Sequence, residues 1–398
     1  MKKKRLLVVS EVFYPEDFLI NDLVDEWTKN GYKVEVLTRN PSYPYGRIYK
    51  GYKNKLYQKD KVGQAVVHRI HFISGYKESA LIKVLNYLWN ALLALVVALF
   101  IGKRFDRVFI YQTGPLTFAL PGAIISKFYR KRTIIWTQDI WPDSVFAYGI
   151  NQSKVNQFLL STFVRFVYKN CSHILVSSKG FIPKIKNYVP HKEIGYVPQW
   201  SLVDYKAYSR EKYLSKNHFN FTFAGNIGKV QNLENVIHGF GSFAQKNSNV
   251  RLNIIGDGSN LDNLKSLVSK FAYSGIVFHG RKPLDQMASY LLSSTVLIIS
   301  LQNKEIFKLT IPAKFQAYLS AKKPLMCVML GEVKEMVDEN KLGLSCHPDD
   351  IEAISNTFQK LVNMSDEERE VFSVNAGLLE QKEYKRDDLI HKITQVVF

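Results

Sequence analysis

Cysteine is scarce in this 398-residue chain, and its placement excludes the usual cysteine chemistries. The three cysteines, Cys171, Cys327 and Cys346, are odd in number and far apart, with no CxxC spacing. We therefore expect buried thiols in a reducing compartment, with no disulfide scaffold. The histidines on predicted strands stand singly and share no metal-ligand spacing, so neither a bound metal nor another cofactor is expected.

Acidic residues are sparse in the first half of the chain, which carries most of the net charge of +19. Residues 1–198 contain 30 Lys and Arg against 13 Asp and Glu, a net +17, whereas residues 199–398 contain 24 against 22. An excess confined to one half indicates a polyanionic partner, either nucleic acid or an anionic membrane surface. No RNP, zinc-finger or helix-turn-helix pattern is present, which favours the membrane.

Long apolar runs are limited to one, VLNYLWNALLALVVALFI at residues 84–101. With its basic flanks it approaches the roughly 20 residues of a membrane span. Asn86 and Asn90 interrupt it, and a crossing here would place two strands of one sheet on opposite sides of a bilayer. We expect a helix that is buried or rests on the membrane, with shallow insertion at an anionic surface as an open alternative.

The N-terminal MKKKRLLVVS is expected to form a first strand rather than a signal peptide.

Predicted strands and helices alternate along the rest of the chain. One series runs through residues 1–198, beginning with an apolar strand at 6–10, and a second restarts with a strand at 219–224. Residues 198–217 have no clear periodicity and are predicted to be the link, and residues 40–60 a loop. The pattern predicts two doubly wound α/β domains in tandem. Ligands of such sheets bind at the carboxyl ends of the strands, so the default site is the cleft between the domains.

One stretch of the second domain combines a helix start, two lysines and a carboxylate. Thr310 is a predicted N-cap and Pro312 fits the first turn, so a helix should begin here with free backbone N–H groups. Lys308 and Lys314 bracket this helix start, and Glu332 begins another helix beyond the next strand. Such an arrangement suits a phosphate ester that also carries hydroxyls. The alternative is a capped surface helix with solvated lysines.

Seven short motifs follow one another along nearly the whole chain. They are FYPE at 13–16, TQDIWPDS at 137–144, VSSKGF at 176–181, VPQW at 197–200, FAGNIGKVQNLENVI at 223–237, IIGDGS at 254–259, and TIPAKFQAYLSAKKP at 310–324 with its following Gly331-Glu332. Each motif alone is weak. Together and in this order they resemble the GT-B glycosyltransferases of family 4, particularly the WbuB type of bacterial enzyme that extends lipid-linked surface polysaccharides such as O-antigen or capsule.

The resemblance implies two Rossmann-like domains facing across a cleft. Residues 1–198 would form the acceptor and membrane-facing domain, residues 199–380 the nucleotide-sugar domain, and residues 381–398 a helix returning to the first domain. It also implies sugar transfer from a nucleotide sugar with retention of anomeric configuration and without a metal. UDP is favoured because the resembling subgroup mostly uses it, and an acetamido sugar is one candidate. The acceptor would be a saccharide on a polyprenyl diphosphate, which a cytoplasmic, peripheral protein would meet at the inner face of the cell membrane.

The donor site must stabilise charge that develops on a departing nucleoside diphosphate. Many members of the family use two glutamates and an Arg-Lys pair, but this chain has Leu309 and Ala317 where the glutamates would stand, and no such pair in its glycine loop. We therefore expect Lys314 and Glu332 to act in catalysis. The remaining donor contacts are expected from Gly225, Asn226, Gly228, Lys229, Gly256, Asp257, Arg281, Thr310 and Gln316.

The acceptor side of the reaction is assigned to two motifs of the first domain. Asp139 could contact the acceptor hydroxyl as a third catalytic residue, Trp141 offers a flat face to a sugar ring, and Glu16 lies in the FYPE motif. An ordinary turn in which Asp143 caps the next element is an equal alternative. We favour front-face attack over double displacement, because no carboxylate pair stands out as a nucleophile in the second domain. A sugar-nucleotide 2-epimerase and an inactive partner subunit remain alternative functions.

Overall fold

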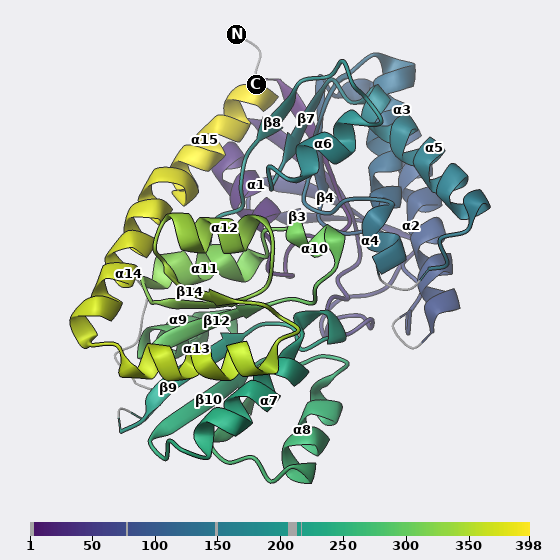
Figure 1. Ribbon diagram of the computed structural model, residues 1–398. Helices are drawn as coiled ribbons and strands as arrows, with labels where there is room; N and C mark the ends of the chain where they lie inside the picture. Colours follow the sequence, from purple (N-terminus) through teal and green to yellow (C-terminus); the bar gives the residue numbers. More distant parts are fainter. Residues whose placement is uncertain (1–3, 77–78, 148–149, 206–212, 216) are drawn as a thin grey trace. The chain divides into compact units, whose positions relative to one another are not determined.

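The computed structural model describes residues 4–76, 79–147, 150–205, 213–215 and 217–398 (Figure 1). The chain forms two compact units. Unit 1 comprises Met1–Pro198 together with Asp387–Phe398, and unit 2 comprises Gln199–Arg386. Much of the predicted link, residues 206–212 and 216, lies outside the described residues.

Unit 1 contains a mostly parallel sheet of eight strands in the described residues. The strand order is β3-β4-β2-β1-β5-β6-β7-β8, and β3 runs antiparallel to β4. Leu6, Leu7, Val8 and Val9 of the central strand are 0% exposed, as expected for a strand that is buried on both faces. The strands are β1 Arg5–Ser10, β2 Lys33–Arg39, β3 Tyr57–Val62, β4 Ala65–Ile70, β5 Arg107–Gln112, β6 Arg132–Thr137, β7 His173–Val176 and β8 Ile194–Tyr196.

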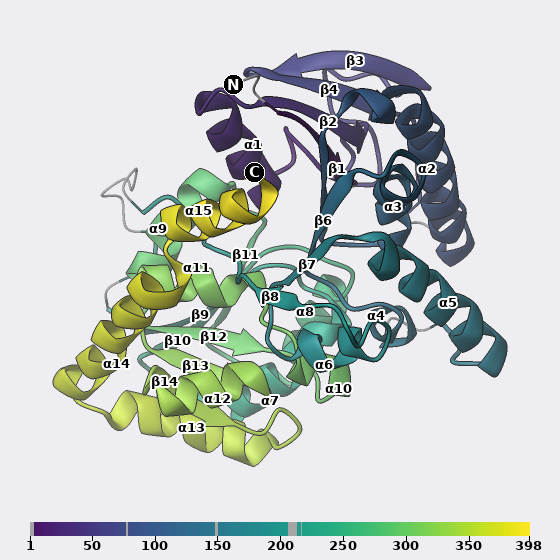
Figure 2. The ribbon, with the colours of Figure 1, turned by 90° about the horizontal axis from the view of Figure 1, so that it is seen from above.

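Helices cover both faces of this sheet. Figure 2 shows α1 and α15 on one side of the strands and α2, α3 and α5 on the other. The helical segments of the unit are α1 Leu19–Lys29, α2 Ala80–Ile101, η1 Gly102–Arg104, η2 Leu116–Ala119, α3 Leu120–Tyr129, α4 Asp143–Ala147, α5 Lys154–Asn170, α6 Phe181–Lys186 and α15 Arg386–Val397. Unit 1 is thus doubly wound, as its alternating pattern predicts.

The last helix, α15, is bonded to unit 1 at several points. The Trp27 indole donates to the Thr394 hydroxyl at 2.8 Å, and Arg107 donates to the carbonyl of Val397 at 2.6 Å. The ring of Phe398 stacks on Tyr32 with centroids 3.7 Å apart. Residues 387–398 therefore complete the layer that α1 begins.

In its described part, unit 2 contains a parallel sheet of six strands in the order β11-β10-β9-β12-β13-β14. Phe221 of β9 packs edge-on against Phe240, Phe243 and Phe358 of the helices on one face, with centroids 4.7–6.4 Å apart. The strands are β9 Phe219–Ala224, β10 Val250–Ile255, β11 Ile276–Gly280, β12 Val296–Ser300, β13 Leu325–Val328 and β14 Gly343–Cys346. The helical segments are η3 Lys229–Gln231, α7 Leu233–Ala244, α8 Leu261–Lys270, α9 Leu284–Ser293, α10 Glu305–Lys308, α11 Ala313–Ala321, α12 Glu332–Glu339, α13 Ile351–Asn363, α14 Asp366–Leu379 and η4 Glu380–Tyr384. Two α/β units in tandem confirm the predicted fold class.

Strand β3, at Tyr57–Val62, begins within residues 40–60, for which the sequence predicts a loop. It pairs with β4 from Tyr57 opposite Ile70 to Val62 opposite Ala65, at the edge of the sheet. None of its residues is fully buried, and it carries Lys59, Asp60 and Lys61. Charged edge strands avoid pairing with other chains, but they lack the apolar run that identifies an interior strand.

The long apolar helix α2 connects β4 to β5. By length and composition, Leu81–Arg104 could cross a membrane, with a mean hydropathy of 2.2, and 33% of its most apolar window is buried. The helix packs on β2, β4 and α3. Its buried side includes Asn86, Asn90 and Ala94, whereas most of its large apolar side chains are on the opposite, exposed side.

Candidate functional site

Two glycine loops of unit 2 meet at the carboxyl ends of β9 and β10. The amide of Gly225 donates to the carbonyl of Ile255, and the amide of Ile227 donates to the carbonyl of Asp257, each at 2.9 Å. The parallel pairing of the two strands therefore continues into the loops that follow them. This is the edge of the sheet at which α/β proteins bind ligands.

Glycine is required in this pair of loops because the two backbones touch. A Cβ on Gly256, whose φ is +145°, would lie 1.8 Å from the carbonyl oxygen of Gly225. A Cβ on Gly258 would lie 2.4 Å from the carbonyl oxygen of Ile227. The IIGDGS motif thus has a steric cause that is independent of any ligand.

Lys314, in the first turn of α11, reaches the first of these loops. Its Nζ lies 3.7 Å from the centroid of the Phe223 ring. It also lies 3.6 Å from the position that a Cβ on Gly225 would occupy. The Nζ is buried and has no hydrogen-bond partner among the described residues. Burial lowers the pKa of Lys314 to about 7, so a bound anion would supply the partner that the ammonium lacks.

The start of α11 differs from the prediction for Thr310. Its hydroxyl donates to the carbonyl of Ile306 at 2.8 Å and so closes the short helix α10. Pro312 occupies the N-cap position of α11, and no side chain caps the helix. The N-cap prediction for Thr310 is therefore wrong, because the preceding carbonyl competes for its hydroxyl.

Gln316 lies in the interior beneath the same turn. It is fully buried, and its amide nitrogen, in the orientation that gives both amide atoms suitable neighbours, donates to the carbonyls of Pro312 and Ala313 at 3.0 Å. Its side chain therefore holds the helix start.

Glu332 begins α12 beside the chain that leads to α11. Gly331 precedes it with φ +84°, and a Cβ there would lie 2.0 Å from the carbonyl oxygen of Lys308. The close contact places the start of α12 next to the end of α10. A carboxylate in a first helical turn is stabilised by the helix dipole whether or not a ligand is present.

The other predicted donor residues occupy the rim of unit 2. Asn226 and Lys229 are exposed in the first glycine loop, and the amide of Gly228 donates to Gln231 at 2.8 Å. The Asp257 carboxylate accepts from its own neighbour Gly258 at 2.8 Å. Arg281 is exposed after the edge strand β11. The structure thus brings Gly225, Gly256 and Lys314 together. Arg281 is outside this group, after β11, the edge strand beside β10.

In unit 1, Asp139 is half-buried just after β6. Its carboxylate accepts from the Ser144 hydroxyl at 3.1 Å, from the backbone N–H of Ile140 and from the indole N–H of Trp141. Burial raises the pKa of Asp139 to about 6, against these hydrogen bonds. A hydrogen-bonded carboxyl with a raised pKa is a candidate proton acceptor. Trp141 is only 9% exposed, and Asp143 begins α4 and pairs with Lys184.

Glu16 is an internal partner of Arg39. The Glu16 carboxylate accepts from Arg39 Nη1 at 3.1 Å and from the amides of Ser42 and Tyr43 at 2.8 and 2.6 Å. Both charged side chains are 2% exposed. Glu16 therefore organises the loop that follows β2, with its acceptor capacity already in use.

Sequence reasoning missed a set of polar side chains at the carboxyl edge of the unit 1 sheet. Glu11 lies 3.5 Å from Arg39, and burial raises the pKa of its carboxyl. Lys83 and Tyr87 of α2 interact electrostatically with Glu11, and Tyr87 also with Asp139. Glu11 and Arg39 stand at the ends of β1 and β2, and this position was the available signal.

Among the described residues, no three His, Cys, Asp or Glu side chains gather so that they could hold a metal ion. Lysine and arginine side chains are the cations that this part of the chain itself supplies.

Comparison with known proteins finds a family match within unit 2. Residues 205–377 match the family described as "Glycosyl transferases group 1". The probable glycosyltransferase WbjE of Pseudomonas aeruginosa is 23% identical over 247 residues, 58% of this chain and 60% of WbjE. The putative colanic acid biosynthesis glycosyl transferase WcaI of Escherichia coli K12 is 26% identical over 231 residues, 54% of this chain and 56% of WcaI. These matches thus span less than two thirds of either relative.

The fold as a whole is shared with solved glycosyltransferases. The structure of Anabaena HepE in complex with UDP and glucose superposes with a TM-score of 0.68 at 12% identity, covering 98% of both chains. This likeness and others of its kind show the GT-B fold. The family match and the sequence relatives support a glycosyltransferase.

Proposed function

We propose that this protein is a retaining glycosyltransferase that moves a sugar from a UDP-linked donor to a lipid-linked saccharide during surface polysaccharide synthesis. The observation that carries the proposal is the buried ammonium of Lys314 beside the glycine loop of Gly225, for which the described part of the chain supplies no hydrogen-bond partner. The presence of UDP and glucose in HepE and the name of WcaI support the donor and the pathway class. The order of the motifs supports the WbuB type.

In this proposal the donor diphosphate lies on the two glycine loops of unit 2. The loops bring backbone N–H groups close to the ligand. Lys314 adds a positive charge that is already desolvated by burial. Because a low dielectric strengthens this interaction, the ammonium stabilises the charge that grows as the anomeric bond breaks. Glu332 accepts hydrogen bonds from sugar or ribose hydroxyls.

Asp139 receives the proton of the acceptor hydroxyl. Its pKa of about 6 leaves the carboxylate mainly ionised at neutral pH, yet basic enough to accept a proton in the transition state. The acceptor attacks the anomeric carbon on the face that the diphosphate leaves, which retains the configuration. No metal takes part, since lysine supplies the positive charge.

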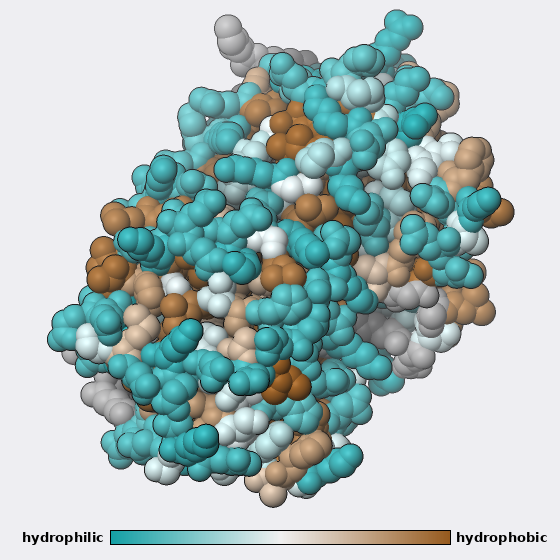
Figure 3. All heavy atoms as spheres, in the orientation of Figure 1, coloured by the Kyte–Doolittle hydropathy of each residue, from teal (hydrophilic) through white to brown (hydrophobic). Residues whose placement is uncertain are grey.

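Unit 1 rests on the inner face of the cell membrane in this proposal. The exposed apolar residues of α2 are 41–86% exposed and comprise Leu81, Val84, Leu85, Leu88, Leu92, Val96, Leu99 and Phe100. Val155, Phe158 and Leu159 of α5 are exposed as well. Both helices pack on α3, and hydrophobic side chains reach the surface along this edge in Figure 3. Basic residues of unit 1 would meet anionic headgroups while these side chains insert shallowly.

The test is nucleotide release from a panel of UDP, GDP and other nucleotide sugars, with and without a short polyprenyl-diphosphate saccharide in detergent. Release should require one UDP sugar and the lipid acceptor, and the product should keep the anomeric configuration of the donor. Lys314→Ala should lower kcat/KM about 100-fold, the scale for one lost transition-state partner. Lys265→Ala, on the exposed side of α8, is the control. Tight donor binding without release for any acceptor would favour the inactive-partner alternative.

A further inference from the structure

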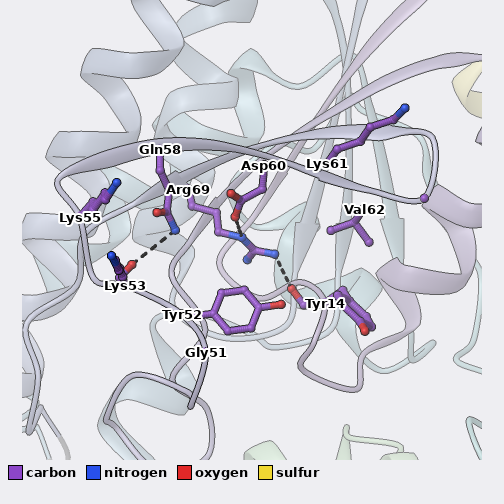
Figure 4. Close-up of a pocket in the computed structure, with 11 residues that line it drawn as sticks. Tyr14, Gly51, Tyr52, Lys53, Lys55, Gln58, Asp60, Lys61, Val62 and Arg69 are labelled. Carbon is purple, nitrogen blue, oxygen red and sulfur yellow. Dashed lines mark hydrogen bonds and ion pairs between the residues drawn. The ribbon is translucent and has the colours of Figure 1, made fainter.

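A pocket of unit 1 lies on the β3–β4 hairpin, where no proposed step of the transfer takes place. It has a volume of about 700 Å³ and is bordered by Tyr14 after β1 and by the segment Gly51–Lys55. Figure 4 shows Arg69 of β4 extending into the centre of this group, with the carboxylate of Asp60 above it and the ring of Tyr52 below. The guanidinium of Arg69 therefore lies at the centre of the residues that line the pocket.

Arg69 is fully buried but only partly satisfied. Its Nε donates to Asp60 at 2.8 Å, and its Nη2 donates to the carbonyl of Tyr14 at 2.7 Å. The guanidinium carbon lies 5.3 Å from the centroid of the Tyr52 ring. Nη1, however, has no hydrogen-bond partner among the described residues. Buried donors are nearly always paired, so this nitrogen indicates a missing acceptor.

The remaining charges of the pocket have the same sign. Lys53, Lys55 and Lys61 are exposed at its border, and Asp60, the acid among its lining residues, is already paired with Arg69. Excess positive charge around a buried guanidinium favours an oxyanion, which Nη1 can bind through a charge-assisted hydrogen bond. Tyr14, 50% exposed, and Tyr52 add ring faces and hydroxyls that suit a sugar.

We propose that this pocket binds the oxyanion of an acidic saccharide, with a phosphate or carboxylate on Arg69 and the sugar against Tyr14 and Tyr52. Under the proposed function, which this statement deepens, the ligand is part of the acceptor. The acceptor saccharide would then be anionic, and its charged group would be recognised by unit 1 itself.

The test is direct binding of three probes to the full chain at low salt by NMR or calorimetry: glucose 6-phosphate, glucuronate and glucose. One or both anions should bind at millimolar concentrations or tighter, and glucose at least tenfold more weakly. Whichever anion binds identifies the group. Arg69→Gln should weaken binding about tenfold, the loss expected for a charged hydrogen bond.

Two further variants keep the test valid if Arg69→Gln does not fold. Tyr52→Leu and the double variant Lys53→Gln/Lys55→Gln should each weaken binding about threefold to fivefold. Lys59→Gln, at an exposed lysine of β3 outside the pocket, should leave the affinity unchanged. Absence of binding by both anions, equal binding of glucose, or unchanged affinity in the pocket variants would overturn the proposal.

UDP binding, measured on the same samples, separates this inference from the proposed function. UDP affinity should be the same in wild type, Tyr52→Leu and Lys53→Gln/Lys55→Gln, because these residues belong to unit 1. Loss of UDP binding with intact sugar-phosphate binding would refute the donor site alone. The reverse result would refute the Arg69 pocket alone.

Discussion

The affinity of unit 2 for UDP should depend on the protonation of Lys314. With a pKa of about 7 in the free protein, the ammonium is about nine-tenths charged at pH 6 and one-tenth charged at pH 8. A diphosphate that pairs with it restores the pKa towards that of an ordinary lysine. Linkage then predicts that binding weakens about tenfold between pH 6 and pH 8.

The perturbation that isolates this effect is Lys314→Arg, because a guanidinium stays charged across the whole range. UDP itself gains charge between these pH values, so the informative quantity is the ratio of dissociation constants of the two proteins. Calorimetry at constant ionic strength should show this ratio changing about tenfold from pH 6 to pH 8. A ratio that does not vary with pH would show that Lys314 does not contact the diphosphate, and the donor-site reasoning would fail.

Other perturbations test other parts of the structure. Lys314→Met should raise the Tm at pH 6, where the wild-type chain must bury a charged ammonium, and the difference from wild type should shrink by pH 8 in thermal scans. Asp139→Asn should lower kcat about 100-fold and remove the acid limb near pH 6 of the pH–rate profile. The Tm should be retained or raised, because the variant no longer desolvates an ionised carboxyl. An unaltered pH–rate profile would contradict the role of Asp139 as proton acceptor. Gly256→Ala should lower the unfolding free energy by about 3 kcal/mol or more, because its Cβ would clash with Gly225. Gly280→Ala, where φ is +67° and the space around the Cβ is open, should lower it by about 1 kcal/mol. Equal losses for the two variants in denaturant titrations would refute the contact. Leu88→Glu/Leu92→Glu should weaken flotation with anionic vesicles at least tenfold, whereas Leu378→Glu on α14 should not.

Much of the fold could be predicted from local pattern. The unbroken apolar run at Leu6–Val9 and the restart at Phe219 mark buried parallel strands, and each became a central strand of its sheet. The edge strand β3 could not be found in this way, because an exposed, charged strand has the composition of a loop. Strands can therefore be predicted from the sequence where they are buried, because burial requires a run of apolar residues.

The candidate site was predictable in part, for a related reason. Gly225 and Gly256 follow the ends of β9 and β10, and strands that pair in parallel bring such positions together. Lys314 was predicted from the helix start that it accompanies. The partners of Glu16 and Arg69 depend on contacts between separate segments. Glu16 pairs with Arg39, 23 residues away, and Arg69 reaches the carbonyl of Tyr14, 55 residues away. The spacing of residues within one motif does not predict such pairs. A side chain whose chemistry suits a ligand can therefore be bonded within the protein instead.

Helix α15 has a consequence for the order in which the protein is made. A ribosome releases the sheet of unit 1 first, but the segment that packs beside α1 emerges after all of unit 2. Until then Trp27 lacks Thr394 and Tyr32 lacks Phe398, so the apolar surface formed by these two rings beside α1 is left uncovered. The unit whose synthesis starts first is thus completed last, and a fragment ending at residue 198 would keep that surface uncovered.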